Sequence, residues 1–197
     1  MGRRNTKAKF ELRNCDAKDI FTAACNFELA LAKLQKATND AFKSIPKGGT
    51  GQPFRLYESI AVNAAMSTEL FLKCLLQIDL GGWTNGHNHV QLFRELSVDR
   101  QKEIRRYHDN YMETDLEQIR RANWNSQMYG LPPSKLDFDS QLNEKKNAFI
   151  HMRYWFERPE SRLEYKTLGY PDTVARSVRN VILKVRPEWE DIAITLT

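Results

Sequence analysis

The sequence is poor in the features that mark secreted, disulfide-rich or metal-binding proteins. Its 197 residues include three cysteines, an odd number at no metal-ligand spacing, which argues against a disulfide framework or a zinc site. The N-terminal segment MGRRNTKAKFELRN lacks a hydrophobic core, so no secretory signal is expected. These absences favour a reducing cytoplasm, with Cys25 and Cys74 as buried free thiols in apolar helical segments.

Several motifs of catalysis and ligand binding are also missing. The glycine-rich loop 45–51 is followed by no Gly-Lys-Ser/Thr, which argues against a phosphate-binding loop. No Gly-x-Ser-x-Gly nucleophile elbow occurs. His87 and His89 form a His-x-His pair, but no Cys, Asp or Glu follows at short ligand spacing. The sequence therefore predicts neither a metal nor a cofactor.

The charge is mildly basic, with a formal net charge of +5 and a pI near 9.1. Basic residues occur in short clusters, of which Arg105-Arg106 and Arg120-Arg121 are candidates for contacting RNA or other phosphates. Solvated helix faces are the alternative explanation for each cluster. The charge alone does not indicate a dedicated nucleic-acid-binding protein.

Apolar residues recur at helical spacing along most of the chain. The run from Ile60 to Leu80 is apolar nearly all round, apart from a polar stripe formed by Glu69, Lys73 and Gln77. Such a helix is typical of the centre of a helical domain, and its charged residues argue against a membrane span. Gly81 and Gly82 are expected to end it, and Thr84-Asn85-Gly86 to turn the chain.

The other expected helices have recognisable starts and stops. They cover 16–44, about 55–80, 89–106 with a break at 97–99, 111–124, 137–157 and 172–186, with Pro187 as the last stop signal. The sequence thus predicts an all-α protein, an antiparallel helical bundle of about five to six helices. Residues 1–15 are expected to form a basic N-terminal tail and residues 16–197 a single domain.

Two fragments resemble one known family. The phrase AAMSTELFLKCLL, followed by a glycine turn and HVQLFREL, is similar to the HEPN family of small all-helical proteins. The later fragment AFIHMRYWFE resembles the last core helix of many HEPN proteins, where an Arg-Tyr pair precedes a Glu. The resemblance implies a HEPN-like bundle and a homodimer. It also implies a role in a prokaryotic stress, toxin–antitoxin or anti-phage system.

The family's catalytic motif is altered in this chain. Catalytic HEPN proteins carry an Arg, then four to six intervening residues, then a His, and two protomers join their copies to cleave RNA without a metal. Here Lys146 stands where that Arg is expected before His151, with Asn147 next to it. Lys keeps the charge but loses the bidentate fork of Arg. Lys146, Asn147 and His151 are nevertheless the candidate catalytic residues.

Arg153 lies in the middle of the apolar face of the same expected helix. A buried guanidinium needs a partner, and Glu69 in the central helix is the candidate, which predicts a structural Glu69–Arg153 ion pair across the core. The alternative for Glu69 is a local pair with Lys73, four residues further along the helix.

Three hypotheses for function follow. The missing Arg favours a HEPN-like protein that acts by binding a partner protein, a nucleotide or RNA, without catalysis. The second hypothesis is a metal-independent endoribonuclease that uses Lys146 and His151 at a dimer cleft. The third is a helical adaptor that only makes protein–protein contacts. None of the three involves a membrane.

Overall fold

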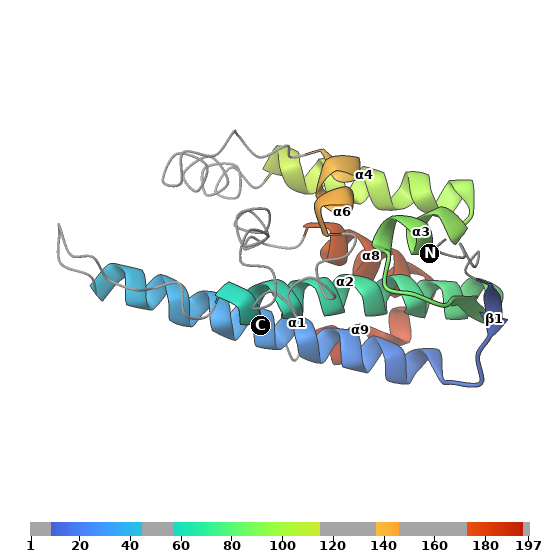
Figure 1. Ribbon diagram of the computed structural model, residues 1–197, viewed down its shortest axis with the longest axis horizontal. Coiled ribbons are helices and arrows are strands. Elements are labelled where there is room, and N and C mark those ends of the chain that lie inside the picture. The colour runs from blue at the N-terminus through green and yellow to red at the C-terminus, as the bar shows by residue number, and fades with distance from the viewer. Residues whose placement is uncertain (1–8, 45–56, 115–136, 146–172, 195–197) are drawn as a thin grey trace, which may run out of the picture.

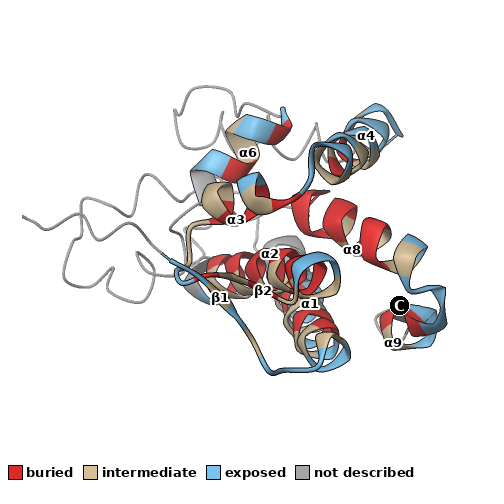
Figure 2. Ribbon diagram, turned by 90° about the vertical axis from the view of Figure 1, so that its right-hand side faces the viewer, coloured by how far each residue is buried: buried red, intermediate tan, exposed pale blue. Residues whose placement is uncertain are grey.

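The computed structural model describes residues 9–44, 57–114, 137–145 and 173–194. These residues form an all-α fold, as the sequence predicts, with one small two-stranded sheet at its end (Figure 1). The helices lie in two layers, and one helix, α8, lies between them (Figure 2). Predictions for residues in the intervening ranges lie outside the described part of the chain.

The first layer is a long antiparallel pair, α1 (Ala17–Ser44) and α2 (Tyr57–Leu80), which lie side by side (Figure 1). Asp16 caps α1 as predicted, because its Oδ1 accepts a hydrogen bond from the Lys18 backbone N–H at 2.8 Å. The two helices pack through aromatic and aliphatic side chains, with the rings of Phe21 and Phe71 5.7 Å apart.

Helix α2 is the central helix of the fold and is buried nearly all round, as predicted. Phe71, Leu72, Leu75 and Leu76 are fully buried. The stretch Ser59–Leu80 is long and apolar enough to cross a membrane by length and composition, but most of it is buried inside the protein. That burial is typical of a core helix.

The second layer consists of α3 (His89–Glu95), α4 (Val98–Thr114) and α6 (Phe138–Lys145). The break predicted near residue 97 is confirmed. The second predicted boundary, between Arg106 and Tyr111, is wrong because α4 continues through these residues. Ile104 and His108 are both buried, and packing of this face holds the polar helix together past the expected end.

Helix α8 (Thr173–Val185) joins the layers, contacting α2, α4 and α6 (Figure 2). Its apolar stripe is fully buried, and Pro187 ends it as predicted by starting a 3₁₀ turn, η4 (Pro187–Trp189). The chain then returns to α1 through α9 (Glu190–Ile194).

A cluster of opposite charges ties α4 to its neighbours. The Arg100 guanidinium donates to Asp79 of α2 at 3.1 Å and to Glu103 at 3.4 Å, and Lys184 of α8 also donates to Glu103. Burial raises the pKa of Glu103, but the hydrogen bonds and charges of Lys184 and Arg100 outweigh it, leaving the pKa below 4.5.

The small sheet was not expected from the sequence. Strand β1 (Phe10–Leu12) pairs antiparallel with β2 (Gly82–Thr84), so part of the predicted basic tail is ordered against the protein. Gly81, at φ 72°, ends α2 and lets the chain turn into β2. The strands approach closely at Gly82, where a Cβ would lie 2.2 Å from the Glu11 carbonyl oxygen.

Candidate functional site

The polar stripe of α2 faces the segments that form the small sheet. Gln77 Nε2 donates to the backbone carbonyls of Arg13 at 3.1 Å and Cys15 at 3.2 Å. These bonds fix the chain between β1 and α1 onto the end of α2. A stripe that breaks an otherwise apolar helix is therefore the place where polar loops attach to the core.

Glu69 is the most deeply buried member of the stripe, and its side chain is 1% exposed. Its Oε1 accepts a hydrogen bond from Lys73 Nζ at 2.6 Å and lies 2.9 Å from His87 Nδ1. The local Glu69–Lys73 pair, the alternative given by the sequence, is thus present. Arg153 lies outside the described residues, so the Glu69–Arg153 pair stays a prediction.

The path of the chain after β2 places His87 beside Glu69. The segment from β2 runs back along α2 and enters α3 at Asn88, whose side chain caps that helix by accepting from the Gln91 N–H at 3.1 Å. His87 precedes the cap and reaches Glu69, while its side chain remains 43% exposed. A buried carboxylate therefore orients a histidine that solvent and solutes can reach.

We call Glu69, Lys73 and His87 the histidine cluster, and an aromatic ring lies next to it. The Lys73 ammonium is 5.5 Å and the Arg13 guanidinium 5.4 Å from the ring centroid of Trp83. Arg13 also pairs with Glu11 at 2.9 Å and donates to Asn85 Oδ1. The network holds β1, β2 and α2 together and surrounds the site with groups of both signs.

The arginines predicted to contact phosphates on α4 do not form a joint site. The Arg105 guanidinium pairs with Asp139 at 2.8 Å and lies over the rings of Phe93 and Phe138. Arg106 is 64% exposed, and its guanidinium lies over the Tyr107 ring. Arg105 therefore contributes to the packing of α3, α4 and α6.

The other predicted site residues lie outside the described residues: Arg120, Arg121, Lys146, Asn147, His151 and Arg153.

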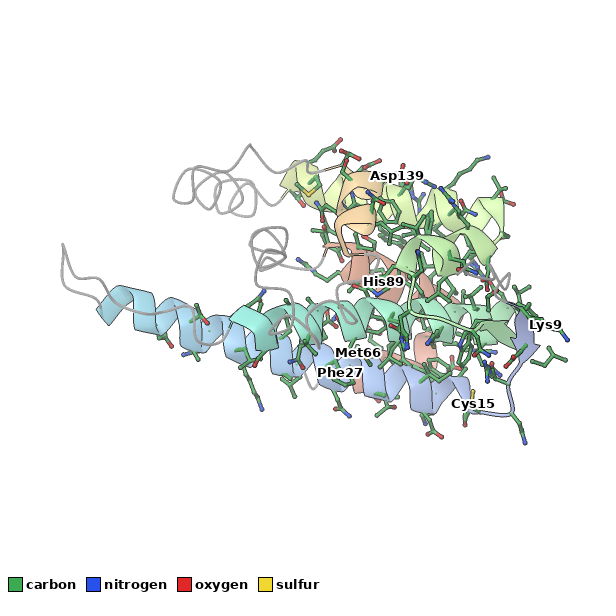
Figure 3. All side chains as sticks on the ribbon, in the orientation of Figure 1. Lys9, Cys15, Phe27, Met66, His89 and Asp139 are labelled. Carbon is green, nitrogen blue, oxygen red and sulfur yellow. The ribbon has the colours of Figure 1, made fainter. Side chains whose placement is uncertain are left out.

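The two members of the His-x-His pair lie in different surroundings. His87 is partly exposed, whereas His89 is fully buried between the layers (Figure 3). Within the described ranges, no group of three or more His, Cys, Asp or Glu side chains is arranged to hold a metal ion. The chemistry available at the histidine cluster is hydrogen bonding, charge and proton transfer.

No family model, curated protein or solved structure matches the chain. The resemblance to HEPN proteins therefore remains a hypothesis.

The sequence predicts one part of this site, the Glu69–Lys73 pair, but not the position of His87. A Glu and a Lys four residues apart in an otherwise apolar helix indicate a buried pair. The His-x-His spacing gives no indication that His87 contacts Glu69. That contact depends on the path of the segment between β2 and α3, which periodicity does not describe.

Proposed function

We propose that the protein binds a phosphate-bearing ligand, single-stranded RNA or a nucleotide, at the surface around His87. The observation that carries the proposal is the buried Glu69 carboxylate, which holds both His87 and Lys73. A histidine fixed in one orientation loses little conformational entropy when it donates to a ligand.

The charges of the cluster favour an anion. The Lys73 side chain is 12% exposed and already balances the buried Glu69 carboxylate. The His87 ring shares the same carboxylate at a half-exposed position, where a ring N–H can donate to a phosphate oxygen. Without the ammonium of Lys73, the Glu69 carboxylate would repel the phosphate. We therefore assign Lys73 an electrostatic role and His87 the direct contact.

The HEPN resemblance supports binding over cleavage, because Lys146 replaces the Arg of the catalytic motif. On the same resemblance we propose that the protein is cytoplasmic and acts in a stress or defence system. The homodimer implied by the same resemblance is part of this proposal.

A second candidate function is metal-independent RNA cleavage, and the Glu69–His87 contact favours it. A carboxylate that orients a histidine is the arrangement used for general acid–base catalysis. His87 would accept the proton of a ribose 2′-hydroxyl while the 2′ oxygen attacks phosphorus. The bond to the 5′ oxygen would break, and the proton would pass to that leaving oxygen.

The test uses fluorescent single-stranded RNA and the full-length protein in EDTA. Fluorescence anisotropy measures binding and a denaturing gel measures cleavage, for the wild type, His87→Gln and Lys73→Met. Lys33→Ala, on the exposed face of α1, is the matched control. Loss of the charge-assisted contact is expected to weaken binding about tenfold in His87→Gln. Lys73→Met is expected to weaken binding as well, because the Glu69 carboxylate then faces the phosphate without a balancing charge, and circular dichroism checks that this variant is folded. Lys33→Ala is expected to bind like the wild type.

Cleavage separates the two candidates. Binding without cleavage supports the binding protein, and cleavage that His87→Gln abolishes supports the enzyme. Cleavage lost instead in Lys146→Ala and His151→Ala would move the activity to the family-like motif. A wild type that neither binds nor cleaves the RNA, and that does not bind fluorescently labelled ATP in the same anisotropy assay, would refute both proposals and leave the helical adaptor.

A further inference from the structure

The large hydrophobic side chains exposed on the described part of the protein lie at one end of it. They are Phe10, Leu12, Leu80 and Val98, which are 39%, 78%, 47% and 65% exposed. Two of them lie on β1, one ends α2 and one begins α4 (Figure 1). The Asp79–Arg100 pair joins the last turn of α2 to the first turn of α4. We call this surface the apolar end.

Strand β1 contributes an open backbone edge to the apolar end. The Lys9 carbonyl accepts from Asn85 N–H at 3.4 Å, and the Arg13 N–H donates to the Gly81 carbonyl at 2.9 Å. Because backbone groups in a strand alternate between its two edges, those of Phe10 point away from β2. They face the outer edge of the sheet, where a further strand can pair.

The opposite edge of the sheet is occupied. The outward N–H of Thr84 in β2 donates to the Glu95 carboxylate of α3 at 2.9 Å. Among the described residues, β1 therefore provides the edge available for pairing. Lys9 lies at the outer end of the molecule beside it (Figure 3).

We propose that β1 pairs antiparallel with β1 of a second copy, about a twofold axis at Phe10. The two Phe10 residues would exchange both backbone hydrogen bonds. Lys9 of each copy would then lie directly opposite Glu11 of the other, in the closer type of cross-strand pair. Lys9 is exposed and the Glu11 side chain is 41% exposed. The segment Lys9-Phe10-Glu11 is thus complementary to itself in this register.

The interface also explains why hydrophobic side chains gather at the apolar end. Pairing of the edges brings the two apolar ends together, so Leu12, Leu80 and Val98 can lose contact with water on both copies. Three-residue strands give a small interface, and we expect a dissociation constant on the order of 10 µM.

Charge reversal provides a sharp test. Lys9→Glu places two carboxylates opposite each other at each cross-strand pair, and Glu11→Lys places two ammonium groups there, so each variant repels its own copies. A mixture of the two variants restores two attractive pairs. Sedimentation velocity from about 1 to 200 µM is expected to show dimers for the wild type, at least tenfold weaker self-association for each variant, and recovery in the mixture.

The controls separate repulsion from misfolding. Glu11 also pairs with Arg13 within its own chain, so Glu11→Lys is checked by circular dichroism. A folding defect would not be repaired by mixing, whereas repulsion would. Lys33→Glu makes the same charge change on α1 and is expected to dimerise like the wild type. A monomeric wild type at about 200 µM, or a dimer that Lys9→Glu leaves unchanged, would overturn the proposal.

Discussion

Replacement of Glu69 by Ala is expected to be one of the most destabilising single changes outside the aliphatic core. Glu69 is 1% and Lys73 12% exposed, so the substitution leaves an ammonium nearly buried without its counter-ion. Removing one partner of a buried ion pair lowers the free energy of unfolding by about 3–5 kcal/mol. His87, at 43% exposure, regains water and adds little to that cost.

Urea denaturation followed by circular dichroism measures this loss. With a slope of about 2–3 kcal/mol per molar urea, the midpoint should fall by more than about 1 M. The double variant Glu69→Leu with Lys73→Met removes both charges and keeps apolar volume, so it should be more stable than Glu69→Ala. Lys36→Ala, which breaks an exposed pair with Asp40, is the control and should not change the midpoint.

Either of two results would contradict this prediction. A loss of less than about 1 kcal/mol in Glu69→Ala would mean that water reaches Lys73 and that the cluster is not buried in solution. A double variant less stable than the single one would mean that the pair itself, and not the stranded charge, stabilises the fold.

Three further predictions test other parts of the structure. Burial raises the pKa of Cys25 to about 12 and raises the pKa of Cys74 as well, while Cys15 is exposed. A thiol reagent at about pH 8 should therefore modify Cys15 alone in the native protein and all three in urea. The pKa of Glu103 is lowered, so its contribution to stability is complete above pH 4.5 and is lost as the pH falls through the folded-state value. Acid unfolding should therefore be less steep in Glu103→Gln, and an unchanged profile would contradict this assignment. Gly82→Ala should lower the free energy of unfolding by about 1–3 kcal/mol, because the added Cβ meets the backbone of β1. Wild-type stability in that variant would show that the strands are not closely paired.

The main helices could be predicted because each buries a regular apolar stripe. Helix α1 begins one residue after its predicted cap, α2 ends at the predicted glycines, and α8 ends before the predicted proline. The predicted break between α3 and α4 is also confirmed, and the structure gives its cause: Ser97 caps α4 by accepting from the Arg100 N–H, directly after the buried Leu96. Local sequence sufficed where local signals and burial agreed.

The sheet and the histidine cluster could not be predicted in the same way. Each strand has three residues, too few for an alternating pattern, and the partners lie far apart in the sequence. The Lys73 contact follows from helical spacing, but the His87 contact depends on how a loop lies across α2. Similarly, nothing in the sequence showed that Arg105 covers the rings of Phe93 and Phe138.

The central position of α8 has a consequence for the kinetics of folding. Helices α1 and α2 are neighbours in the sequence, whereas α8 packs against helices that come much earlier in the chain. Contacts between distant segments form late, because closing long loops costs entropy. We therefore expect Val178→Ala in α8 to accelerate unfolding with little change in the folding rate. The lifetime of the native state is then set by how fast α8 leaves the space between the two layers.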